Sequence, residues 1–162
     1  MRIRTALLVA ATTVLAVASI CLSPLPATTA EAATERSAAA DRWYVDTMLF
    51  RVSMSYFLAS VGVDRWFDWS TDLCSAPLVG STGRSFDFRH PCRRHDFGYR
   101  NLRLIDRRYG THQWNATSRK AIDDRFLRDM LNHCETRSAW LRTSCRWWAQ
   151  TFYAAVRLFG GP

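Results

Sequence analysis

The sequence predicts a small, all-α domain that is stapled by disulfides and exported from the cell. Apolar residues recur at spacings of three and four along most of the chain, which is the period of one helix face. No segment shows the period-two alternation of a half-buried strand. Four cysteines follow an N-terminal export signal, and an even cysteine count in an exported chain indicates disulfides.

The export signal has the usual three parts. A basic start is followed by an uncharged, mostly apolar run over residues 6–22 and a small-x-small cleavage pattern at residues 30–32. The apolar run is shorter than the ~20 residues that a membrane-spanning helix needs. We therefore expect residues 1–32 to be a signal peptide, residues 33–162 to form one folded domain, and the protein to be secreted.

The first helix is predicted to begin at Asp41 and to end before Gly62. Its apolar face consists of Val45, Met48, Leu49, Val52 and Tyr56. A short second helix or a packed turn follows around Trp66–Trp69. Residues 75–91 contain two prolines and two glycines and are predicted to be a loop.

Three longer helices are predicted to complete the domain. One begins near Cys92 and stops at Gly110. The next is capped by Thr117 or Ser118. The first of these helices carries His95, Tyr99, Leu102, Ile105 and Tyr109. The apolar face of the second consists of Ile122, Phe126, Leu127, Met130 and Cys134. The apolar face of the last helix consists of Leu141, Trp148, Phe152, Ala155 and Phe159.

The four cysteines of the folded domain allow three pairings. The local pairing, Cys74–Cys92 with Cys134–Cys145, encloses the shortest loops, and we favour it. Each bridge would add about 2–4 kcal/mol by restricting the unfolded chain. A zinc site is disfavoured because no Cys-x-x-Cys pair is present.

The densest polar pair is His95-Asp96, early in a predicted helix. Neighbours on a helix point about 100° apart, so the two side chains can serve different partners. An imidazole can take a proton near neutral pH, and a carboxylate can bind a hard cation. The alternatives are structural: His95 as a core histidine, and Asp96 paired with Arg100 at i+4.

Two further segments supply candidate partners for this pair. Asp123 shares a face with apolar residues, where a carboxylate is costly unless paired, whereas Asp124 aligns with Arg128 at i+4, which suits an exposed ion pair. If the two helices pack antiparallel, Asp123 can orient His95. A Cys74–Cys92 bridge would bring Asp72 and the Leu73 carbonyl near Asp96, which makes a reasonable calcium shell.

These segments resemble the secreted prokaryotic and fungal phospholipases A2. Residues 67–74 resemble their calcium loop, residues 92–101 their catalytic helix, and residues 122–134 their second catalytic helix. The resemblance spans roughly residues 67–159, and the segment around His95 is the most specific part.

The resemblance implies a calcium-dependent carboxylic ester hydrolase. His95 would activate a water for attack on the sn-2 ester of a glycerophospholipid, and Asp123 would orient His95. Asp72 and Asp96 would bind Ca²⁺ through their carboxylates, and Leu73 through its carbonyl oxygen. The products would be a fatty acid and a lysophospholipid. The implied fold is two antiparallel catalytic helices beside a calcium-binding loop.

The high arginine content leaves one rival open. With a net charge of +8, the chain suits a non-enzymatic cationic protein that binds or disrupts membranes. Nucleic acid is a weaker partner, because the basic residues are scattered and no binding motif appears. We expect a monomer that contacts phospholipid surfaces peripherally. Trp66, Trp69 and Trp147 are the tryptophans for which exposure to such a surface is weighed equally against burial.

Overall fold

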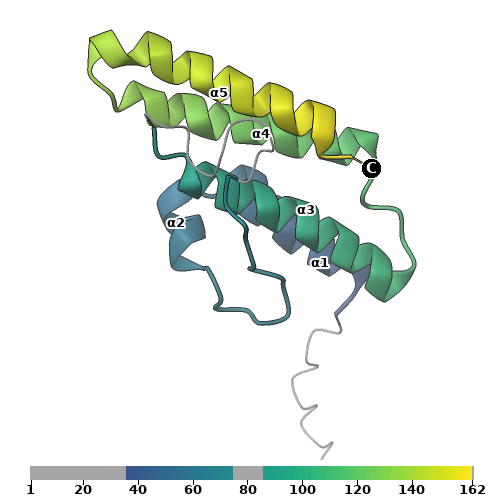
Figure 1. Cartoon of the computed structure of the whole chain (residues 1–162). Coiled ribbons are helices and arrows are strands. Elements are labelled where there is room, and N and C mark those ends of the chain that lie inside the picture. Colours follow the sequence, from purple (N-terminus) through teal and green to yellow (C-terminus); the bar gives the residue numbers. More distant parts are fainter. Residues whose placement is uncertain (1–35, 75–85, 162) are drawn as a thin grey trace, which may run out of the picture. The chain divides into compact units, whose positions relative to one another are not determined.

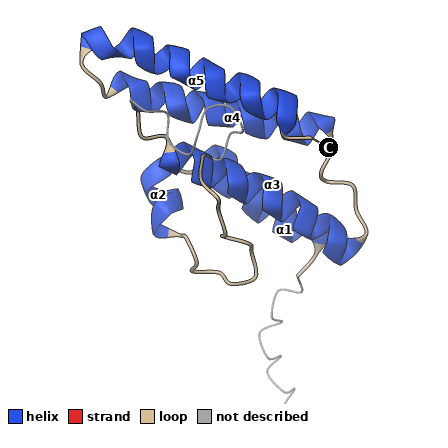
Figure 2. Cartoon of the chain, viewed as in Figure 1, coloured by secondary structure: helices blue, strands red, loops and turns tan. Residues whose placement is uncertain are grey.

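The computed structural model describes residues 36–74 and 86–161. The predicted signal peptide and most of the predicted loop 75–91 lie outside these residues. The described elements are, in order, α1 (Ala38–Asp46), the π-helical turn η1 (Thr47–Arg51), α2 (Met54–Ala59), α3 (Arg89–Tyr109), α4 (Ala116–Glu135) and α5 (Ala139–Phe159). Helices are the sole regular elements in this part of the chain, which confirms the all-α prediction (Figure 2).

The predicted first helix is in fact interrupted once: α1 runs directly into η1, and the break lies between η1 and α2. η1 ends where Val52 adopts an extended backbone, and Ser53 then caps α2 by accepting a hydrogen bond from the Tyr56 amide. Serine at this position competes with the helix for backbone groups, which explains why a continuous apolar period does not give a continuous helix. Residues around Trp66–Trp69 form a packed turn rather than a helix.

The ends of α3 and α4 depart from prediction by a few residues. α3 begins at Arg89, so Pro91 lies inside its first turn, where a missing N–H costs no hydrogen bond. Gly110 ends α3 in the left-handed region, at φ 65°, as its position predicted. The cap of α4 is Asn115, not Thr117 or Ser118; Ser118 completes the capping box from inside the helix.

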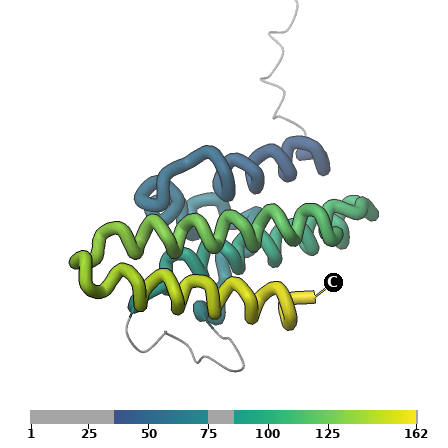
Figure 3. Tube along the Cα trace, turned by 90° about the horizontal axis from the view of Figure 1, so that it is seen from above, coloured from purple at the N-terminus to yellow at the C-terminus, as the bar shows by residue number. Residues whose placement is uncertain are grey.

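The three long helices run in alternating directions. Figures 1 and 3 show α3, α4 and α5 as consecutive antiparallel neighbours, with α1 on the side of the bundle away from α5. One buried cluster joins α1, η1 and α2 to α3 and α4, and a second lies between α4, α5 and the start of α3. Gly98 permits the close approach of α3, because a Cβ there would lie 3.0 Å from Leu49 and 3.1 Å from Ile122.

Two disulfides fasten this arrangement, and both match the favoured pairing. Cys74–Cys92 joins the segment before α3 to the first turns of α3. Cys134–Cys145 joins the end of α4 to α5. In the described ranges, the helices are all too short or too polar to cross a membrane.

Candidate active site

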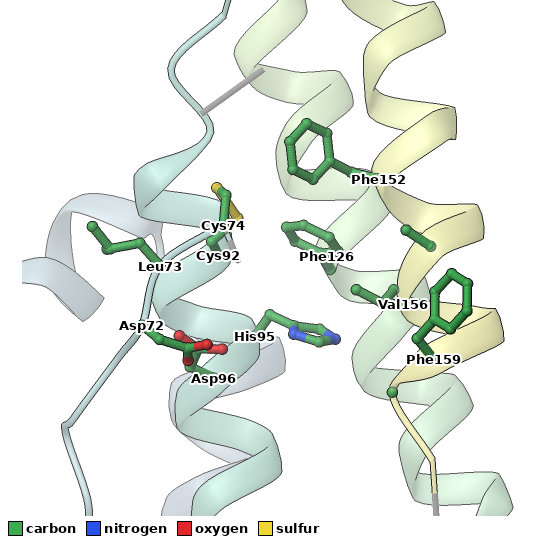
Figure 4. Close-up of a pocket in the computed structure, with 12 residues that line it drawn as sticks. Asp72, Leu73, Cys74, Cys92, His95, Asp96, Phe126, Phe152, Val156 and Phe159 are labelled. Carbon is green, nitrogen blue, oxygen red and sulfur yellow. A yellow bond between two sulfur atoms is a disulfide. The ribbon is translucent and has the colours of Figure 1, made fainter. Parts of the chain in front are cut away.

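Helix α3 presents His95 and Asp96 in two directions. The His95 ring is largely buried and reaches from α3 toward α4 and α5 (Figure 4). The Asp96 carboxylate instead lies beside that of Asp72, on the segment that precedes α3 (Figure 4). The roughly 100° step between neighbouring helical residues is what separates them. The structure therefore brings together two pairs of groups, His95 with Asp123 and Asp96 with Asp72.

His95 is hydrogen-bonded to a fully buried carboxylate. Its Nε2 lies 2.7 Å from Oδ1 of Asp123, which has no exposed surface. The Tyr99 hydroxyl donates to the same oxygen at 2.6 Å. An ionised carboxylate accepts hydrogen bonds, so this contact favours the neutral tautomer of His95 that has its proton on Nε2 and a lone pair on Nδ1. The Nδ1 atom can therefore act as a base, and the hydrogen bond between Nε2 and Asp123 fixes the orientation of the ring.

Hydrogen bonds keep Asp123 ionised in this buried position. Burial by itself raises the pKa of Asp123, but the hydrogen bonds from His95, Tyr99 and Arg157 outweigh it, and the pKa lies below its usual range. Arg157 donates from α5 to Oδ2 at 2.8 Å, and the Arg119 Nε lies 3.7 Å from the same oxygen. An imidazolium formed at His95 would thus face a carboxylate that stays charged.

The neighbouring Asp124 has a different environment. Its side chain is partly exposed, pairs with Lys120 at 2.7 Å and accepts a hydrogen bond from Tyr153. It makes no hydrogen bond to His95 among those of the described residues. The helical phase that singled out Asp123 from the sequence thus agrees with where the structure places it.

The segment before α3 brings Asp72 to Asp96. The Cys74–Cys92 bridge fixes this segment, and Leu73 adopts the left-handed region at φ 60°. That conformation costs a non-glycine residue on the order of 1–3 kcal/mol and is concentrated at functional sites. Asp72 is exposed and accepts a hydrogen bond from Arg100 at 2.8 Å, so Arg100 pairs with Asp72 rather than with Asp96.

Asp96 is a carboxylate held in an unfavourable setting. Burial raises the pKa of Asp96, a hydrogen bond from the Thr71 hydroxyl lowers it, and the nearby charge of Asp72 raises it again. Two like charges at one site are relieved by a cation between them. Two carboxylates and a backbone carbonyl are also the hard oxygen donors that calcium prefers, so these residues fit that ion. The described ranges contain no cluster of three or more His, Cys, Asp or Glu side chains arranged as a metal site.

A cavity of about 230 Å³ joins the two pairs. Asp72, Leu73, His95 and Asp96 form its polar end (Figure 4). The facing wall comes from α4 and α5 and is apolar: Phe126, Phe152, Ala155, Val156 and Phe159. A polar end that holds a base beside an apolar wall suits a substrate with both an ester and a hydrocarbon chain.

Sequence reasoning missed two features of this site. It treated the aromatic residues of α4 and α5 as core, whereas Phe126, Phe152 and Phe159 also line the cavity. It also assigned no role to Arg157, although this side chain donates a hydrogen bond to Asp123. Spacing alone gives no sign of either, because both depend on how α5 rotates against α4.

Known proteins match this chain over most of the described residues. The family model for "Prokaryotic phospholipase A2" matches residues 45–160. A secretory phospholipase A2 of the fungus Arthroderma benhamiae is 35% identical over 120 residues, which covers 71% of this chain and 76% of that protein. One from Beauveria bassiana is 42% identical over 94 residues, covering 58% of this chain and 44% of the relative.

Proposed function

The chain belongs to the prokaryotic phospholipase A2 family, and on that premise we propose that it hydrolyses the sn-2 ester of glycerophospholipids with the help of Ca²⁺. The observation that carries the proposal is the bond between His95 Nε2 and the buried Asp123, at the polar end of a cavity with an apolar wall. As a phospholipase A2, the protein is an enzyme that acts on phospholipids.

His95 is the general base in this proposal. Its Nδ1 takes a proton from a water that attacks the ester carbonyl, and the ring then returns the proton to the departing glycerol oxygen. Asp123 holds the ring orientation and stabilises the transient imidazolium, and Tyr99 and Arg157 keep Asp123 in place. A fatty acid and a lysophospholipid leave, and no serine or cysteine nucleophile takes part.

Asp72, Asp96 and the Leu73 carbonyl are the proposed calcium ligands. When bound, Ca²⁺ supplies Lewis-acid polarisation of the ester carbonyl and stabilises the negative charge that develops on its oxygen. The burial of Asp96 beside Asp72 supports this assignment, because a cation there would offset their repulsion. The apolar wall that includes Phe126 and Phe152 holds the acyl chain and limits the access of bulk water.

Two further assignments accompany this function. The family relatives carry the description secretory, which supports export of this chain by a signal peptide over residues 1–32. Residues 33–162 would then be the mature catalytic domain, acting as a monomer with peripheral contact to phospholipid surfaces.

The test is fatty-acid release from a phosphatidylcholine with different acyl chains at sn-1 and sn-2. With calcium, we expect the sn-2 acid to be released and the sn-1 chain to remain on the lysolipid. A chelator should abolish release, and added calcium should restore it. Release of the sn-1 acid, or release that the chelator leaves unchanged, would contradict the proposal.

A further inference from the structure

The outer face of α5 carries exposed apolar side chains in one stripe. Trp140, Trp147 and Leu158 are 79%, 61% and 76% exposed. At 100° per residue these three lie within about 20° of one another around the helix axis. Ser144, Thr151 and Ala154 fill the positions between them, so the stripe is uncharged along the whole helix. Scattered apolar residues are normal on a surface, but two exposed tryptophans and a leucine on one uncharged helix face suit contact with a partner.

The charges of α5 are all on another side. Arg142, Arg146 and Arg157 fall within an arc of about 60°, away from the stripe. Each is engaged with α4 or the turn that follows it. Arg142 donates to the Arg137 carbonyl, Arg146 to Glu135 and Arg157 to Asp123. The stripe therefore carries no arginine, although the chain has a net charge of +8.

The stripe continues into the wall of the cavity. Phe159 follows Leu158 by one residue, is 57% exposed, and lines the cavity together with Phe152 and Val156 (Figure 4). Partly buried Trp148 lies between the stripe and this wall in helical phase. A mostly apolar surface thus runs without a charged residue of α5 from Trp147 to the cavity mouth. α5 is also the outermost of the three long helices in Figures 1 and 3.

We propose that the outer face of α5, with Trp140, Trp147 and Leu158, is the surface by which the protein docks on a phospholipid bilayer. This rests on the proposed function, because a phospholipid can pass from a bilayer into the cavity only through a cavity mouth that faces that bilayer. Tryptophan suits this position: its ring settles among the headgroups while its N–H stays hydrated. A helix lying in the plane of the interface would insert the stripe and bring Phe159 to the acyl chains.

The test is vesicle sedimentation with the W140A/W147A double variant. The vesicles consist of a dialkyl ether phosphatidylcholine, which has no ester to cleave, so binding is measured without hydrolysis. The neutral headgroup also removes the general attraction between the arginines and anionic lipid. We expect the partition coefficient of the double variant to fall about tenfold or more below that of the natural chain. Its melting temperature should be unchanged, because both rings are exposed.

The matched control is W43A/Y56A. Trp43 and Tyr56 are 63% and 57% exposed and lie on α1 and α2, on the side of the bundle away from α5. We expect the control to bind the vesicles within about twofold of the natural chain, because its two aromatic residues lie outside the proposed docking surface. Equal loss in both double variants, or no loss in W140A/W147A, would overturn the proposal.

Two further measurements test a dimer interface and the proposed function separately. If light scattering shows a dimer that W140A/W147A dissociates, the stripe is an interface between copies of this chain and the proposal is wrong. Hydrolysis of a short-chain phosphatidylcholine dispersed as monomers tests the proposed function on its own. Absence of that hydrolysis in the natural chain would refute the function while the vesicle result still decides whether α5 binds lipid.

Discussion

At the scale of single residues, Asp123 is the group on which the site depends. It has no exposed surface, and its two oxygens accept hydrogen bonds from His95, Tyr99 and Arg157, which come from two other helices. A carboxylate in such a position is costly unless all its partners are present. In the proposed function, Asp123 fixes the tautomer of His95 and offsets the charge that His95 acquires.

Replacing Asp123 by Asn keeps the shape and removes the charge. The imidazolium then loses its counter-ion, and the amide can present N–H to Nε2 and favour the wrong tautomer. We expect kcat to fall on the order of 10²–10⁴-fold, with calcium affinity retained. Fatty-acid release and calorimetric calcium binding check this. Turnover equal to that of the natural chain would show that Asp123 does not orient the base.

The same residue predicts how stability responds to acid. The pKa of Asp123 is lowered in the folded protein from the ordinary value of 3.8, so its stabilising contribution is present above that pH. The contribution is lost as the pH falls through the folded-state pKa. In calcium-free buffer, the melting temperature of the natural chain should drop more steeply below about pH 4 than that of D123N. Parallel curves would contradict this assignment.

At the scale of elements, the two disulfides connect different parts of the fold. Cys74–Cys92 fixes the segment that carries Asp72 and Leu73 against α3, and Cys134–Cys145 fastens α5 to α4. The proposed calcium ligands lie next to the first bridge, whereas the second lies where the chain turns from α4 into α5. The first bridge should therefore matter for the ion, and the second for the helix pair.

Removing each bridge in turn tests this division. The variants C74A/C92A and C134A/C145A should each lose about 2–4 kcal/mol of unfolding free energy, measured by denaturant titration. Only the first should also lose calcium affinity, by about tenfold or more, because Asp72 and Leu73 are no longer held near Asp96. The prediction is wrong if calcium affinity falls equally in both variants or in neither.

Helical period predicted the long elements well and their interruptions poorly. Most of the faces of α3, α4 and α5, the stop at Gly110 and the burial of Asp123 follow from local spacing, whereas Phe159 of the predicted α5 face is exposed. The break at Ser53 depends on a serine hydroxyl competing for a backbone N–H within an apolar run. The Asn115 cap lies before the two residues that the sequence suggested. The bond from Arg157 depends on tertiary packing, which spacing along one helix does not encode.

At the scale of the whole molecule, the fold presents two neighbouring polar residues on different sides of one turn of α3. Toward α4 and α5, α3 presents His95, which the buried network around Asp123 orients as the base in the proposed function. Toward the preceding segment it presents Asp96, which shares a calcium site with Asp72 in the proposed function. The cavity joins the two, and its apolar wall continues onto the outer face of α5.

Calcium affinity and turnover, measured together on H95N and D96N, test this separation most directly. Calorimetry gives the affinity, and release of the sn-2 fatty acid gives the turnover. We predict that H95N binds calcium within about twofold of the natural chain while its turnover falls on the order of 10³-fold or more. D96N should lose calcium affinity by about tenfold or more and lose turnover with it. Undiminished turnover in H95N, or unchanged calcium affinity in D96N, would contradict the division of roles between the two neighbours.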